Sequence, residues 1–191
     1  ETPNLQFHIQ PISTDKLGGA NLHDFDAFTP TVANIRPTSR GEINIVSPDS
    51  RENPKIKMNY LSTEEDRKVA ADGIRLVRKI VMESQEFKKF EPEEFRPGFH
   101  IQDSEDIIKA CSHYAQTIFH PVGTCKMGND DEAVVSDDLK VKGIDNLRVI
   151  DASIMPNITS GNTNAPTIMI AEKGADTVSY THLRAHETNV E

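Results

Sequence analysis

Two polar stretches hold the side chains best suited to chemistry. The first, residues 117–130, reads TIFHPVGTCKMGND and leads through a β-branched and aromatic run to His120. Pro121 lacks a backbone donor and Gly123 tolerates positive φ, so we expect a short strand that ends at His120 and then turns sharply. Histidine side chains titrate near neutral pH, and one at the mouth of a strand can accept a proton from a pocket. A purely structural histidine is the alternative.

The second stretch, residues 160–167, reads SGNTNAPT and opens an apolar segment. We expect a helix over residues 163–178, with Pro166 in its first turn, where proline is tolerated. The segment is apolar on nearly all sides, which predicts a buried helix. Free N–H groups and the helix dipole make its N-terminus suited to negative charge. His120 and Asn164 are therefore the pair considered for acid–base chemistry.

Other reactive side chains fit known sites poorly. The spacing of Cys111, His113, His120 and Cys125 matches no zinc pattern, so no metal is expected. A nucleophilic Cys125 is conceivable, but a small buried cysteine is favoured. The loop-like segment 129–132, with three acidic residues, lacks the glycine and the closing glutamate of a calcium loop.

Composition limits the classes of function. The 191 residues carry a formal net charge of -9, with 36% hydrophobic and 27% charged residues. No basic stripe is present to neutralise phosphates, which argues against nucleic-acid binding. No apolar run is long enough to cross a membrane. Two cysteines suit a reducing compartment, so we expect a cytoplasmic protein, with peripheral membrane association left open.

The remaining pattern predicts the elements that position these side chains. Strands are expected at residues 5–9, 31–36, 42–46 and 55–60, the last three forming an antiparallel sheet with one wet face. Residues 11–25 read as a loop near a substrate entrance. Ser62 and Glu65 form a capping box, which predicts a helix whose charged residues, including Asp66 and Arg78, face solvent. A shorter helix should run from Asp103 or Ser104 to about Tyr114.

The end of the chain contains a compact apolar run and an unusual tail. Residues 147–152 predict a buried strand whose carboxyl end carries Asp151 to a ligand. Residues 179–191 are polar without an apolar period and resemble a translated cloning adapter, so we treat them as a non-native tail. Residue 1 is not methionine and a strand follows at once, so the chain reads as part of a longer protein.

Two of these motifs resemble one family. Residues 119–128, FHPVGTCKMG, resemble the histidine motif of the glucose-methanol-choline (GMC) oxidoreductases. Residues 146–156, NLRVIDASIMP, with residues 164–167, resemble that family's closing FAD segment. The likeness is greatest to the choline and alcohol dehydrogenase branch, in which the second catalytic position is asparagine, here Asn164.

The resemblance implies an α+β fold in three parts. Residues 1–116 would be part of a substrate-binding domain, with an antiparallel sheet and flanking helices. Residues 117–178 would be the C-terminal catalytic and FAD-binding segment, with the last strand and helix of an incomplete FAD-binding α/β domain. Residues 179–191 would be the tail. The family's Gly-x-Gly-x-x-Gly fingerprint is absent, so an N-terminal FAD-binding portion is missing and this chain alone is expected to be inactive.

By the same resemblance, the whole enzyme oxidises a primary alcohol, choline-like or aliphatic, to an aldehyde by hydride transfer to FAD. His120 is the expected general base and Asn164 the residue that binds the alcohol oxygen. The expected FAD contacts are Asp151, Ala152, Ala165, Pro166 and Thr167. For Asp151 a helix or turn cap is the alternative. The electron acceptor, quinone or oxygen, stays open, as do two other classes: a hydroxynitrile lyase on the same fold and a non-catalytic fragment.

Overall fold

The computed structural model describes residues 2–15 and 21–187, with side chains described up to residue 180. Its elements, in order, are four strands, three α-helices, a short 3₁₀ helix and the final helix α4. The contacts divide the chain into two compact units, Glu1–Ile118 and Phe119–Glu191.

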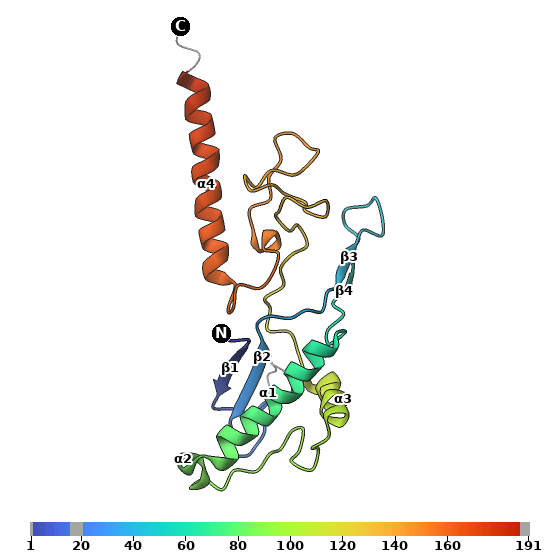
Figure 1. Ribbon diagram of the computed structural model, residues 1–191, viewed down its shortest axis with the longest axis vertical. Helices are drawn as coiled ribbons and strands as arrows, with labels where there is room; N and C mark the ends of the chain where they lie inside the picture. Colours follow the sequence, from blue (N-terminus) through green and yellow to red (C-terminus); the bar gives the residue numbers. More distant parts are fainter. Residues whose placement is uncertain (1, 16–20, 188–191) are drawn as a thin grey trace. The chain divides into compact units, whose positions relative to one another are not determined.

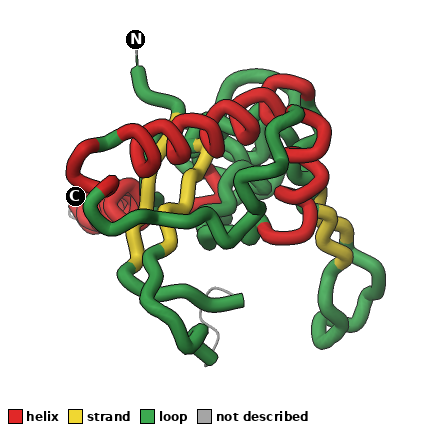
Figure 2. Tube along the Cα trace, turned by 90° about the horizontal axis from the view of Figure 1, so that it is seen from below, coloured by secondary structure: helices red, strands yellow, loops and turns green. Residues whose placement is uncertain are grey.

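The strands of the first unit form two separate antiparallel pairs. β1 (Leu5–Gln10) pairs with β2 (Thr29–Asn34), and β3 (Glu42–Asn44) pairs with β4 (Lys55–Lys57). Figure 2 shows them as two yellow ladders. All four predicted strands are present, but the expectation of one sheet joining β2, β3 and β4 is wrong. β2 takes β1 as its partner, while the short β3–β4 ladder is exposed along its length.

Helix α1 (Glu64–Glu83) packs against β2, and the short α2 (Gln85–Lys88) follows it (Figure 1). The N-cap of α1 is Thr63 and not the predicted Ser62. The Thr63 hydroxyl accepts a hydrogen bond from the backbone amide of Asp66. Gly73 permits the close approach to the strand, since a Cβ there would lie 3.0 Å from Val32 Cγ2. The packing of α1 therefore depends on a missing side chain.

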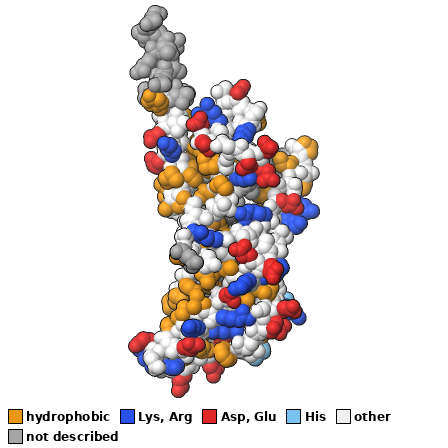
Figure 3. All heavy atoms as spheres, viewed as in Figure 1, with side chains coloured by type: hydrophobic (Ala, Val, Ile, Leu, Met, Phe, Trp, Pro, Cys, Tyr) orange, Lys and Arg blue, Asp and Glu red, His pale blue; other side chains and the backbone are white. Residues whose placement is uncertain are grey.

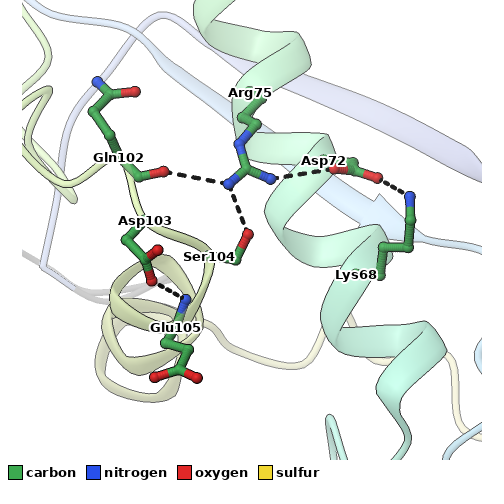
Figure 4. Close-up of polar contacts among 7 residues, drawn as sticks. All are labelled: Lys68, Asp72, Arg75, Gln102, Asp103, Ser104 and Glu105. Atoms are coloured by element: carbon green, nitrogen blue, oxygen red, sulfur yellow. Dashed lines mark hydrogen bonds and ion pairs between the residues drawn. The ribbon is translucent and has the colours of Figure 1, made fainter.

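Helix α3 (Ser104–Tyr114) lies beside α1 and is capped by Asp103, one of the two residues predicted as its cap. Figure 4 shows the polar contacts between the two helices. The Arg75 guanidinium donates to the Ser104 hydroxyl at 2.8 Å and to the Gln102 carbonyl at 3.3 Å, and it pairs with Asp72 on its own helix. Because these groups are partly solvated, we expect them to orient α3 more than to stabilise it.

Asp66 of α1 is buried, which contradicts its prediction as a solvated charge. One carboxylate oxygen accepts hydrogen bonds from the side-chain amide of Asn34 at 3.1 Å and from the backbone N–H of Thr38 at 2.9 Å. The other oxygen accepts from the backbone N–H of Ser39 at 2.8 Å. Burial alone raises the pKa of Asp66, but the hydrogen bonds from Ser39 and Thr38 together lower it below its ordinary value. Asp66 thus anchors the turn after β2 to the start of α1.

Arg78 is the second predicted surface charge that is buried. Its Nε and Nη2 donate to the two carboxylate oxygens of Glu94 at 2.8 and 2.9 Å, and Nη2 also donates to the Gly98 carbonyl at 3.2 Å. A fork of two parallel bonds is the geometry that makes such a pair specific. The contacts of Arg78 with Glu94 and Gly98 therefore fix the segment between α2 and α3 against α1.

The second unit is built on a small core without a named strand among its described residues. The buried members are Val135, Leu139, Ile154, Met155 and Ile170. The prediction of a strand at residues 147–152 is wrong, because the run makes only a single bridge, between Lys140 and Arg148, and then enters the 3₁₀ helix η1 (Ala152–Ile154). The FAD-domain strand expected there is absent from the described residues.

Helix α4 (Asn164–Glu187) contributes Ile170 to this core and extends past the predicted end at residue 178. Residues 188–191 of the predicted tail lie outside the described residues. The helix is not buried on all sides as predicted, since Ile168 and Met169 are 54% and 60% exposed. Hydrophobic atoms are visible on its N-terminal half in Figure 3. No helix in the described ranges is both long enough and apolar enough to cross a membrane.

The buried carboxylate of Asp66 yields a test of stability. Asp66→Asn keeps the shape, but its amide nitrogen faces either the Ser39 N–H group or the N–H groups of Asn34 and Thr38. These groups are all donors, so a buried donor loses its acceptor. We expect a loss of about 2 kcal/mol in the free energy of unfolding at pH 7.

The pH dependence follows from the sign of the shift. The folded-state pKa is below the unfolded value of about 3.9, so the stabilisation is present above that pH and is lost as pH falls through the folded value. Urea unfolding at pH 7 and at about pH 3 should show the gap between the two proteins shrinking in acid. Asp72→Asn, which removes two exposed ion pairs, with Lys68 and Arg75, should cost less than about 0.5 kcal/mol. Equal effects of the two substitutions would contradict this role.

Candidate active site

His120 lies in an irregular loop that is fastened to η1. The strand predicted before it is absent, and Phe119 instead takes a positive φ of 64°. The predicted sharp turn is present, with Gly123 at a φ of 90°. The amides of Gly123 and Cys125 both donate to the Ser153 carbonyl, at 3.1 and 3.0 Å. These bonds hold the loop that carries His120 at a fixed place in the second unit.

The imidazole of His120 meets the residue that precedes helix α4. Its Nδ1 lies 3.0 Å from the hydroxyl oxygen of Thr163, a hydrogen bond between residues 43 positions apart. Thr163 is buried, with 7% exposed, while His120 is half-buried. The Thr163 carbonyl accepts both the amide and the hydroxyl of Thr167, at 3.0 and 2.6 Å. The first turn of α4 is therefore joined to the histidine through one residue.

Asn164 is the first residue of α4 and its side chain is exposed. The structure brings its neighbour Thr163, and not Asn164 itself, into hydrogen-bonding contact with His120. Adjacency in the chain keeps the carboxamide at the same helix end as the imidazole. The two predicted catalytic residues thus belong to one region of the second unit, connected by Thr163.

Thr163 was not among the predicted site residues, although the sequence contains a signal for it. A threonine directly before a helix commonly accepts a hydrogen bond from the second or third helical N–H. Here the third helical residue is Pro166, which has no N–H. A hydroxyl at such a cap keeps a lone pair for another partner, and His120 Nδ1 lies within hydrogen-bonding distance of it.

The start of α4 has the chemistry that suits a flavin cofactor. The N–H groups of Asn164 and Ala165 precede the first intrahelical bonds, and the helix dipole adds partial positive charge. Ala165 is exposed, while Pro166 and Thr167 are half-buried. Small side chains leave this helix end open to an anionic or electron-rich ring edge. The predicted contacts Ala165, Pro166 and Thr167 therefore fit such a group.

Asp151 acts as the N-cap of η1, which was the alternative for this residue. One carboxylate oxygen accepts from the Ser153 amide at 2.8 Å and from the Ser153 hydroxyl at 2.5 Å. Ala152 follows and packs against the core of the second unit. Through Ser153, whose carbonyl receives the loop amides, this cap also supports the position of His120.

The other reactive side chains are accounted for by local contacts. Cys111 and Cys125 are free thiols, and burial raises the pKa of the Cys111 thiol. Asp130 and Glu132 of the acidic loop both pair with Lys126, at 3.2 and 3.1 Å. In the part of the chain that the structure describes, no three potential metal ligands lie together. His120 and the α4 end are thus the candidate site.

Comparison with known proteins identifies the class. The family model described as GMC oxidoreductase matches residues 37–171. The oxygen-dependent choline dehydrogenase of Pseudomonas fluorescens (strain Pf0-1) is 44% identical over 180 residues, covering 93% of this chain and 31% of that protein. Pyridoxine 4-oxidase from Mesorbium loti matches with a TM-score of 0.75 and 31% identity, covering 85% of this chain and 31% of that one. A structure of Aspergillus oryzae formate oxidase, studied for FAD modification, matches with a TM-score of 0.77 and 28% identity. The match covers 85% of this chain and 29% of that one.

The chain belongs to the GMC oxidoreductase family, whose members are FAD flavoproteins. It spans about a third of the length of the curated relatives it matches, 31% of the Pseudomonas protein. The small antiparallel sheets with flanking helices match the C-terminal substrate domain of this family.

The packing of α4 can be tested at Gly174. A Cβ there would lie 2.5 Å from Cγ2 of Ile150 and 2.9 Å from its Cδ1. Helix propensity alone favours Gly174→Ala by about 1 kcal/mol, but overpacking typically costs about 1–3 kcal/mol. We therefore expect the substitution to lower the unfolding temperature, as measured by calorimetry.

Ala175→Val is the matched control, since residue 175 is exposed on the same helix and the added methyl groups meet solvent. It should change stability by less than about 0.5 kcal/mol. A Gly174→Ala protein more stable than its parent would show that α4 does not rest on Ile150 as described.

Proposed function

We propose that this chain is the C-terminal part of an FAD-dependent enzyme that oxidises a small primary alcohol to an aldehyde. The observation that carries the proposal is the hydrogen bond between His120 and Thr163, which joins a proton acceptor to a helix end suited to negative charge. Membership of the GMC family supports the reaction class.

His120 is the proposed general base. Loss of hydride from an alcohol carbon is easier when the oxygen gives up its proton and gains negative charge. With Nδ1 engaged by Thr163, Nε2 is the ring nitrogen left to take that proton. General-base assistance of this kind contributes roughly 10²- to 10⁴-fold in rate. The loop bonds to Ser153 supply the rigidity that positioning requires.

Asn164 is proposed to bind the alcohol oxygen. A carboxamide cannot act as a base near neutral pH, but its N–H groups can donate to an oxygen that is becoming negative. Its place at the first position of α4 puts it where the helix dipole also favours such charge. It would fix the orientation of the substrate while His120 takes the proton.

FAD supplies the acceptor for the hydride when it is bound. Ala165, Pro166 and Thr167 at the open helix end, with Asp151 and Ala152 at η1, are the residues of this chain proposed to line its site. The remainder of the site would come from the N-terminal portion of the same enzyme, which this chain does not include.

A choline-like or aliphatic alcohol is the proposed substrate, because relatives 44% and 46% identical to this chain are named choline dehydrogenases. Their description as oxygen-dependent supports oxygen as the electron acceptor, with a quinone as the alternative. We propose a cytoplasmic location, with peripheral association expected if a quinone is used.

Removal of the proposed base tests the proposal directly. In the full-length enzyme, His120→Ala should slow flavin reduction by an alcohol at least 10²-fold, while the alcohol still binds. Anaerobic stopped-flow absorbance separates the two, since saturation reports binding and the limiting rate reports chemistry. His113→Ala, an exposed histidine outside this site, is the control and should leave both unchanged.

An unchanged limiting rate in His120→Ala would remove the histidine from the chemistry. A parent enzyme whose flavin is not bleached by any primary alcohol would favour the lyase alternative, because a lyase does not reduce its flavin.

Asn164 is expected to matter less than His120. Asn164→Ala should lower the limiting rate of flavin reduction roughly tenfold, the effect of losing one hydrogen bond to a charge that develops in the transition state. Single-turnover traces that overlay those of the parent enzyme would contradict the role assigned to its amide.

A further inference from the structure

We infer that Thr163 is a positioning residue that sets the tautomer of His120. Its hydroxyl accepts the Nδ1–H hydrogen bond and so leaves the lone pair of the imidazole on Nε2. The inference rests on the proposed role of His120 as the base, and it adds a residue to which the sequence analysis assigned no function.

The hydrogen bond between His120 and Thr163 is well formed, and its threonine is held in place by further contacts. The distance of 3.0 Å lies within the normal range for a hydrogen bond to an imidazole nitrogen. Thr163 is 7% exposed, so water competes little for its hydroxyl. The carbonyl of the same residue is held by two groups of Thr167, so the threonine backbone is fixed as well.

The helix end favours the direction of the hydrogen bond that we infer. A neutral imidazole has one donor and one acceptor nitrogen, and the partner of one decides the role of the other. The N–H at the third helical position, which a cap hydroxyl commonly accepts, is missing because that residue is Pro166. The hydroxyl oxygen therefore keeps a lone pair with which to accept Nδ1–H of His120.

For the reaction, this hydrogen bond would keep His120 in the tautomer whose Nε2 can accept a proton. When the alcohol O–H bond breaks, the proton passes to Nε2 and the imidazole becomes positively charged. The Nδ1–H to Thr163 bond then strengthens, because its donor is charged. The other tautomer would place a hydrogen on Nε2, where it would face the alcohol and block proton transfer.

The test measures the tautomer and the rate in the same full-length enzyme. With its histidines labelled with ¹⁵N, the ring nitrogens of His120 should show a protonated Nδ1 and an unprotonated Nε2 when the imidazole is neutral. Assignment comes from the signals lost in His120→Gln. A neutral His120 protonated on Nε2 would overturn the inference whatever the activity of the enzyme.

Two variants separate positioning from structure. Thr163→Val removes the hydroxyl and keeps the shape, so it should mix the tautomers and lower the limiting rate of flavin reduction roughly tenfold, with alcohol saturation changed less than twofold. Thr163→Ser restores the hydroxyl and should recover both the parent tautomer and most of the rate. If Thr163→Val keeps the parent tautomer and rate, the inference fails.

The failure of this inference is distinct from the failure of the proposed function. If His120→Ala abolishes flavin reduction while Thr163→Val is normal, His120 remains the base and only the assignment of Thr163 is lost. If His120→Ala reduces its flavin normally, the proposed function itself is wrong and the tautomer has no catalytic meaning.

Discussion

The hydrogen bond between His120 and Thr163 is the contact on which the account of this site depends. It joins two segments 43 positions apart, and each is held independently. The histidine loop is fastened by amides to the Ser153 carbonyl. The helix is seated by Ile170 in the core and by Gly174 against Ile150. A displacement of either segment would separate the imidazole from the helix end.

This arrangement divides the chemical work between two kinds of structure. The loop supplies a side chain that exchanges a proton, and the helix end supplies fixed dipoles that favour negative charge. Neither needs an ion that is buried before the reaction begins, which would be costly to desolvate. The apolar side chains of Ile168 and Met169, near the same helix end, are exposed in this chain.

Local chemistry was well predicted from the sequence. The turn at Gly123, the cap at Asp103 and the start of α4 with Pro166 in its first turn all follow from properties of one or two residues. The two motifs also led to the correct family. The site residues His120 and Asn164 came from the same motifs, and their catalytic roles remain predictions.

Features that need distant partners were not predictable in this way. In the sequence, Asp66 and Arg78 look like surface charges on a helix. Only the fold reveals that residues 38–39 hydrogen-bond to Asp66 and that Glu94 pairs with Arg78. Residues 147–152 have the composition of a strand, but a strand needs a neighbour to pair with, and here only one bridge forms. Thr163 was missed because its partner, His120, is close in space and far in sequence.

The most direct test of the central claim is a crystal structure of the full-length enzyme with a non-reactive alcohol analogue bound. We expect one substrate oxygen within about 2.6–3.2 Å of both His120 Nε2 and the side-chain nitrogen of Asn164, with Nδ1 still hydrogen-bonded to the Thr163 hydroxyl. An oxygen held by other side chains, or an imidazole turned so that Nδ1 faces the analogue, would contradict it.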